Sequence, residues 1–142
     1  MKNIFLLFFA LVFACGSDSA ECEPAGTWTI TLTLGSGDCL DPGTEGSEQW
    51  TVRTAGDDIT ITDAQGQPAD ILAYDPADCT AEIEVVFYQA ETDLTWEMIG
   101  AARLSVSFDG SQANGDGEIV AVLDIAGTDA ACSQTVSISG TK

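Results

Sequence analysis

The amino-acid sequence predicts an all-β protein that folds as a single eight-stranded, antiparallel up-and-down β-barrel. Apolar and polar residues alternate with a period of two in successive runs, and clusters of turn-forming residues separate these runs. Most connections are short, so consecutive strands should run in opposite directions, and the first strand can pair with the last to close the sheet. A two-sheet β-sandwich would show the same alternation, but the strand count and the absence of a long crossover favour the barrel.

The first predicted strand, Thr27–Leu34, has the most regular pattern. Its apolar residues, from Trp28 to Leu34 at every second position, share one face, and threonines occupy the other face. The apolar face should therefore point into the barrel. The longest loop follows this strand, and the next strands are expected at Gln49–Thr54, Ile59–Thr62, Ala69–Tyr74 and Thr80–Tyr88.

The second half of the chain contains the remaining predicted strands. The stretch from Leu94 to Phe108 keeps its apolar residues on one parity except at Gly100. We interpret it as one long strand with a bulge or bend at Gly100-Ala101, and the alternative is two strands joined by a tight turn. Segment 109–117, DGSQANGDG, has the composition of a turn, and further strands should follow at Glu118–Ile125 and Cys132–Ser139.

Residues 1–14 have the features of an export signal. Lys2 precedes an uninterrupted apolar run at residues 4–13, which is shorter than the roughly 20 residues that a membrane-spanning helix needs. The sequence Val12-Phe13-Ala14-Cys15 resembles the lipobox of bacterial lipoprotein signal peptides. This resemblance implies that Cys15 is lipidated and becomes the first residue of the mature protein. The alternative is an ordinary secretory signal that is cut elsewhere.

Residues 15–25 are then expected to form a flexible acidic tether between the lipid and one barrel domain at residues 26–142. Gly16, rather than Asp, follows the lipidated Cys, which resembles the sorting pattern of outer-membrane lipoproteins. We therefore expect a lipid-anchored protein of the bacterial cell envelope, located at the outer membrane.

The five cysteines support export, because lipidation of Cys15 leaves an even number for disulfide bonds. Zinc binding is disfavoured, since the chain has no His and no closely spaced Cys pair. Cys22 and Cys79 each precede a strand that points the same way, so both should lie near one end of the barrel. Cys39 follows the first strand and Cys132 opens the last, so both should lie near the other end. We predict the pairs Cys22–Cys79 and Cys39–Cys132.

The composition argues against several functional classes. The chain has 23 acidic and 4 basic residues and a formal net charge of −19, so nucleic acids and anionic head groups would be repelled. It contains no histidine, which excludes His-based acid–base catalysis and His-ligated metals. No lysine lies within the predicted strands to activate a Ser or Thr nucleophile. We therefore expect no enzymatic activity, no catalytic residue, no cofactor, no bound metal and no nucleic-acid partner.

Gly26-Thr27-Trp28, at the start of the first strand, resembles the G-x-W motif of lipocalins and related calycins. The resemblance implies a lipocalin-like barrel in which Gly26 begins the first strand and Trp28 plugs the closed end, so both residues are structural. Lipocalins typically stack an Arg from the last strand across this Trp. Here the last strand has no Arg, and the only basic residue near it is Lys142. The chain also has no counterpart of the family's central Thr-Asp-Tyr motif.

Two functions fit such a barrel. The first is the binding of a small apolar or amphipathic ligand, which an eight-stranded barrel can just accommodate. The second is a structural or interaction role in the cell envelope, with a barrel filled by its own side chains, because the inward-facing residues include several large aromatics. For the first function, the expected lining residues lie away from the closed end: Leu32, Leu34, Trp50, Phe87, Leu94 and Trp96.

Overall fold

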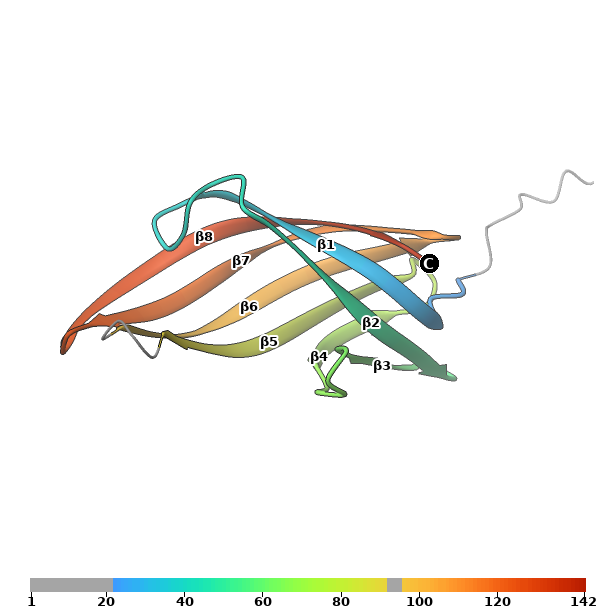
Figure 1. The fold of residues 1–142 in the computed structure, drawn as a ribbon. Helices are drawn as coiled ribbons and strands as arrows, with labels where there is room; N and C mark the ends of the chain where they lie inside the picture. Colours follow the sequence, from blue (N-terminus) through green and yellow to red (C-terminus); the bar gives the residue numbers. More distant parts are fainter. Residues whose placement is uncertain (1–21, 92–95) are drawn as a thin grey trace, which may run out of the picture.

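The computed structural model describes residues 22–91 and 96–142 and confirms the predicted all-β class (Figure 1). Eight antiparallel strands form one sheet that curls into a nearly closed barrel. The signal peptide, Cys15 and most of the predicted tether lie outside the described residues. The strands are β1 (Gly26–Gly37), β2 (Glu45–Ala55), β3 (Asp58–Thr62), β4 (Asp70–Asp75), β5 (Thr80–Glu91), β6 (Trp96–Asp109), β7 (Gln112–Ile125) and β8 (Thr128–Thr141).

The strands pair as an up-and-down meander whose first and last members meet. Their order across the sheet is β3-β2-β1-β8-β7-β6-β5-β4. In β1, Trp28 lies opposite Trp50 of β2, and Leu32 lies opposite Ile138 of β8. The predicted antiparallel pairing of the first and last strands is therefore confirmed. No helix that is long and apolar enough to cross a membrane occurs among the described residues.

The barrel wall is incomplete between β2 and β5. The strands between them, β3 and β4, have 5 and 6 residues, about half the length of their neighbours. They are joined by a bridge between Thr62 and Pro68 and by a 2.9 Å hydrogen bond from the Ala69 amide to the Ile61 carbonyl oxygen. β3 pairs only with residues 51–55 of β2, and β4 pairs only with residues 80–84 of β5. The other halves of β2 and β5 therefore have a single neighbouring strand each among the described pairings.

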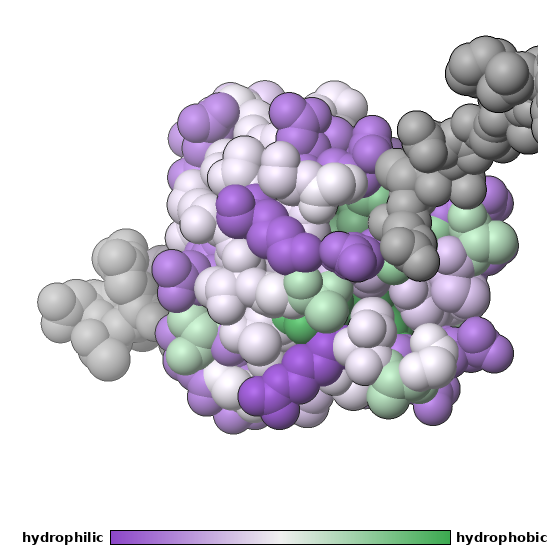
Figure 2. Space-filling view, turned by 90° about the vertical axis from the view of Figure 1, so that its right-hand side faces the viewer, coloured by the Kyte–Doolittle hydropathy of each residue, from purple (hydrophilic) through white to green (hydrophobic). Residues whose placement is uncertain are grey.

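The main hydrophobic core lies at the end of the barrel that β3 and β4 complete. Trp28 and Ile30 are fully buried there, and the Trp28 ring packs against Phe108 with ring centroids 5.2 Å apart. The indole Nε1 of Trp28 donates a 2.7 Å hydrogen bond to the Pro24 carbonyl oxygen. A smaller core cluster is made of Met98, Ala121 and Cys132. Figure 2, which faces the right-hand side of Figure 1, shows a surface of hydrophilic and intermediate residues with hydrophobic residues near its middle.

Both predicted disulfide bonds are present. Cys22 is bonded to Cys79, and Cys39 is bonded to Cys132, with Cα–Cα distances of 5.3 and 5.0 Å. The first bond joins the segment before β1 to the β4–β5 connection, next to the main core. The second joins the β1–β2 loop to β8, next to the smaller core cluster. Their placement at different ends of the barrel follows from the strand directions.

The predicted bulge at Gly100-Ala101 is wrong. β6 pairs in continuous register with β5 over its residues 96–107 and with β7 over its residues 96–109. Gly100 interrupts the apolar pattern for a packing reason, because a Cβ atom there would lie 2.6 Å from Cζ of Phe87 and 2.7 Å from Cβ of Ala121. The missing side chain gives the Phe87 ring its space. From Trp96 onward the stretch is one strand, and Leu94 lies outside the described residues.

The predicted turn at residues 109–117 is also wrong in its length. The chain reverses at Gly110, which has a φ of +57°, and β7 already begins at Gln112. Gly115 and Gly117 are strand residues pressed against β6, since a Cβ atom on either would lie 2.1 Å from a carbonyl oxygen of Ser105 or Arg103. Glycines that permit close approach of two strands therefore resembled turn glycines in the sequence. β1, β2, β5 and β8 also extend beyond their predicted ends.

Candidate functional site

An apolar cavity of about 290 Å³ lies inside the barrel, beside the incomplete part of its wall. Side chains from five strands and from the β1–β2 loop surround it. β3 and β4 do not reach this level, and β6 contributes the small side chain of Ala102, so the space is not filled. The lining residues are Leu32 of β1, Glu48 and Trp50 of β2, Val85 and Phe87 of β5, Met98, Ala102 and Leu104 of β6, Ile119 of β7, and Cys39 and Leu40 of the loop.

The predicted lining residues are partly brought together at this cavity. Leu32, Trp50 and Phe87 line it. Leu34 and Trp96 do not line it: Leu34 packs against the main core, and Trp96 packs against the smaller cluster. Leu94 lies outside the described residues.

Sequence reasoning missed Glu48 as a lining residue, although a signal for it exists. Glu48 has the same parity as Trp50 and Val52, and it lies opposite the fully buried Ile30 of β1. It remains exposed because its half of β2 pairs only with β1. The Trp50 indole Nε1 donates a 2.5 Å hydrogen bond to Oε1 of Glu48, which orients the carboxylate at the rim of the cavity.

The loop between β1 and β2 is fastened across β8, and its residues Cys39 and Leu40 form one side of the cavity. Besides the Cys39–Cys132 bond, the Gln134 side chain makes two hydrogen bonds to the loop and one to the end of β1. Its Oε1 accepts from the Leu40 amide at 2.7 Å, and its Nε2 donates to the carbonyl oxygens of Leu40 and Gly35 at 2.9 and 3.2 Å. Gln134 is 1% exposed, so these bonds satisfy an otherwise buried amide.

The same loop brings Asp38 close to the two sulfur atoms of the Cys39–Cys132 pair. The sulfurs are bonded to each other, so they are not thiolate ligands for a metal ion. The Asp38 carboxylate instead accepts a 2.8 Å hydrogen bond from the Ser133 amide. This cluster therefore has a structural role in fastening the loop.

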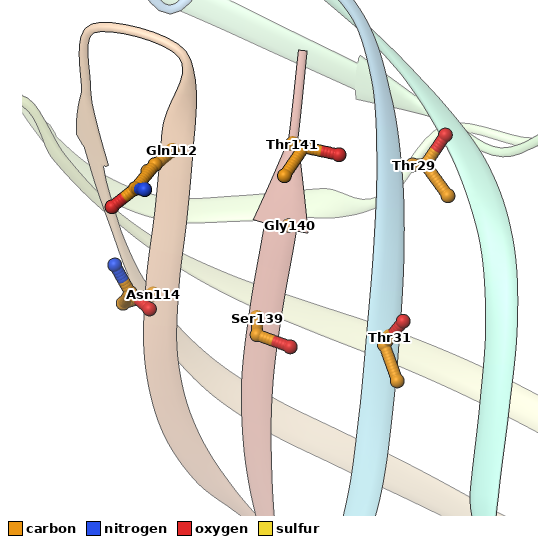
Figure 3. A pocket seen from close by; sticks show the side chains of 7 residues that line it. All are labelled: Thr29, Thr31, Gln112, Asn114, Ser139, Gly140 and Thr141. Atoms are coloured by element: carbon orange, nitrogen blue, oxygen red, sulfur yellow. The ribbon is translucent and has the colours of Figure 1, made fainter.

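A polar groove of about 280 Å³ lies on the outside of the barrel, across β1, β8 and β7 (Figure 3). The strand register places its side chains in two rows: Thr29, Thr141 and Gln112 in one, and Thr31, Ser139 and Asn114 in the other. The described lining residues of this groove carry hydroxyl and amide groups but no charge. The groove lies on the face opposite to the apolar side of β1, and it shares no residue with the interior cavity.

Comparison of the chain with known protein families, with curated protein sequences and with solved structures gave no match.

Proposed function

We propose that this protein is a lipid-anchored, exported β-barrel that binds a small apolar or amphipathic molecule in its interior. The observation that carries the proposal is the 290 Å³ cavity lined by Leu32, Trp50 and Phe87. Its volume is close to the lower end of the usual range for ligand pockets, about 300 Å³. The lining is mainly apolar with a single carboxylate at the rim, which is the pattern of sites that bind small organic molecules.

The resemblance to lipocalins supports the same function. Gly26 begins β1, and Trp28 is fully buried at the end of the barrel that is filled by side chains. The ammonium group of Lys142 lies over the Trp28 ring, where the resemblance calls for a basic side chain. These features fit a calyx with one closed end and a ligand space toward the other. No catalytic role forms part of the proposal.

Binding can be tested with the mature protein without its lipid and the neutral apolar dye N-phenyl-1-naphthylamine. Saturable quenching of tryptophan fluorescence at one site per chain is expected, because Trp50 lines the cavity. Ala102→Leu should narrow the cavity and weaken binding while leaving the protein folded. Ala101→Leu is the matched control, since Ala101 has the opposite parity on β6 and should leave dye binding unchanged.

The alternative function is a structural or interaction role for a barrel without a ligand. The dense packing of the main core around Trp28 favours it. In that case no dye would bind, and Ala102→Leu would destabilise the protein by about 1–3 kcal/mol, as overpacking of a filled core does.

The lipid anchor is tested separately from ligand binding. The lipobox-like sequence Val12–Cys15 predicts that the wild-type protein sediments with the outer-membrane fraction and begins with a lipidated Cys15. Cys15→Ser should release it into the soluble fraction or leave it unprocessed. A soluble wild-type protein that begins at another residue would contradict the anchor.

A further inference from the structure

The charge at the rim of the cavity is negative. Among the described residues that line it, Glu48 is the only one with a charged side chain. Its Oε1 accepts the Trp50 hydrogen bond, which leaves the second carboxylate oxygen free to meet a ligand at the cavity opening.

A second hollow of about 250 Å³ adjoins this rim, in the gap between β2–β3 and β4–β5. The two hollows share three lining residues, Glu48, Trp50 and Val85, so they adjoin each other along these residues. The second hollow is lined by further carboxylates, from Asp63, Asp70 and Glu84. An apolar compartment and an acidic compartment therefore lie side by side.

Among the described residues, no basic side chain lines the apolar cavity. Arg103 is 75% exposed and donates a 2.6 Å hydrogen bond to Oε2 of Glu84. Lys142 lies over Trp28, and the exposed Arg53 has the opposite parity to Trp50 and Val52 on β2. At the rim of the apolar cavity an anionic head group would therefore meet the Glu48 carboxylate and no lining cation, whereas a cationic head group would be attracted.

We infer that the ligand of this cavity is an amphipathic cation, with an aliphatic tail in the apolar cavity and an ammonium-type head group at Glu48. The inference rests on the proposed function and specifies the chemistry of its ligand. Tail size follows from volume: at roughly 30 Å³ for a water-sized group, the cavity holds about ten such groups. A tail of on the order of ten carbon atoms therefore matches the space.

The test compares three probes with equal tails: decyltrimethylammonium, 1-decanol and decanoate, each titrated below its micelle concentration into the delipidated mature protein. Tryptophan fluorescence and calorimetry report the affinity. We expect the ammonium probe to bind about tenfold more tightly than decanoate, with 1-decanol between them. Added salt should weaken binding of the ammonium probe and leave 1-decanol unaffected.

Glu48→Gln keeps the oxygen that accepts the Trp50 hydrogen bond and removes only the charge. It should weaken binding of the ammonium probe by about two- to fivefold and leave 1-decanol binding unchanged. The matched control is Glu45→Gln, three residues away on the outward face of β2, where Glu45 accepts a 3.4 Å hydrogen bond from Thr33. Glu45→Gln changes the net charge equally and should leave all three affinities unchanged.

The outcomes separate this inference from the proposed function. If no probe binds, the ligand-binding function itself fails. If 1-decanol binds and the ammonium probe binds no more tightly, the function stands and the cationic ligand is overturned. Equal weakening by Glu45→Gln and Glu48→Gln would also overturn it, because the preference would then arise from the overall negative charge rather than from the rim. If Glu48→Gln does not fold, the comparison of the ammonium probe with 1-decanol in the wild-type protein still decides whether a cationic head group is preferred.

Discussion

Lys142 closes the filled end of the barrel against Trp28. Its ammonium nitrogen lies 5.5 Å from the centroid of the Trp28 ring and donates a 2.9 Å hydrogen bond to the Glu23 carbonyl oxygen. The Lys142 backbone amide also donates a 2.9 Å hydrogen bond to the Ser111 carbonyl oxygen. The segment before β1, the β6–β7 turn and the residue after β8 are thus held together around one indole ring.

Replacing Lys142 tests this contact. Lys142→Met removes the charge but keeps an unbranched apolar side chain, and it should lower the free energy of unfolding by about 0.5–2 kcal/mol, from the cation–π contact and one hydrogen bond. Urea denaturation followed by tryptophan fluorescence measures the change. Arg53→Met is the control, because it removes an exposed cation on the wall of the barrel and should change stability by less than about 0.5 kcal/mol. Equal effects would show that overall charge, rather than the contact with Trp28, is responsible.

The position of Lys142 beside Trp28 also requires a glycine at position 26. The Gly26 φ of +142° is a conformation that other residues rarely adopt, and a Cβ atom there would lie 2.6 Å from Cε of Lys142. Gly26→Ala should therefore destabilise the protein by about 1–3 kcal/mol. The comparison is Gly46→Ala on β2, where an added Cβ would meet no atom within 4 Å. Similar midpoints of denaturation for the two variants would contradict the role of Gly26.

The sequence was sufficient to predict the class, the number and direction of the strands, and both disulfide bonds, because each depends on a period of two and on chain direction. It was not sufficient where glycine has a packing role. Gly100, Gly115 and Gly117 all lie inside strands, against Phe87 or the backbone of β6. Nothing local to these glycines distinguishes a close approach between strands from a turn or a bulge.

The part of the candidate site that follows from the alternation of inward- and outward-facing residues along each strand was predictable. Leu32, Trp50 and Phe87 followed from that alternation. The sequence predicts that β3 and β4 are short. It does not show how far each of them pairs along its longer neighbour, so the opening in the wall was not predictable. Glu48 was missed for this reason, since a charged residue on the inward face is tolerated only where the wall is open.

The two disulfide bonds should contribute similarly to stability. They join residues 57 and 93 positions apart, and the entropy of loop closure depends only weakly on loop length. Replacing either pair by serines should lower the free energy of unfolding by about 2–4 kcal/mol. Denaturation of the two double variants measures both values. A non-reduced peptide map that links Cys22 to Cys39 would contradict the pairing.

The two tyrosines of the chain should titrate above the ordinary tyrosine value. Burial is the main cause of the raised pKa of Tyr74, followed by the nearby charges of Asp57 and Asp75. For Tyr88, desolvation and Glu97 raise the pKa. Because both pKa values are higher in the folded protein, the protonated tyrosines favour folding. This contribution to the free energy of unfolding is complete below the unfolded pKa of about 10 and is lost as the pH rises through the folded pKa values. The ultraviolet absorbance of tyrosinate in the folded protein measures this, and a midpoint at or below that of the unfolded chain would contradict it.

Gln134 should control the order of the loop that borders the cavity. Gln134→Leu has a similar volume but removes the three hydrogen bonds to Leu40 and Gly35. It should destabilise the protein by about 1–3 kcal/mol, because backbone groups in partly buried hydrogen bonds lose their partners. Hydrogen exchange at the Leu40 amide should become faster, since that amide donates to Gln134 in the folded protein.

The control for Gln134 is Gln49→Leu, which makes the same replacement at an exposed position on β2. It should leave exchange at Leu40 unchanged. Because Cys39 and Leu40 line the cavity, Gln134→Leu should also weaken binding of N-phenyl-1-naphthylamine even though Gln134 is not a lining residue. Faster exchange at Leu40 with unaltered dye affinity would mean that the Cys39–Cys132 bond alone keeps the loop in place. Slow exchange retained in Gln134→Leu would contradict the fastening role of this side chain altogether.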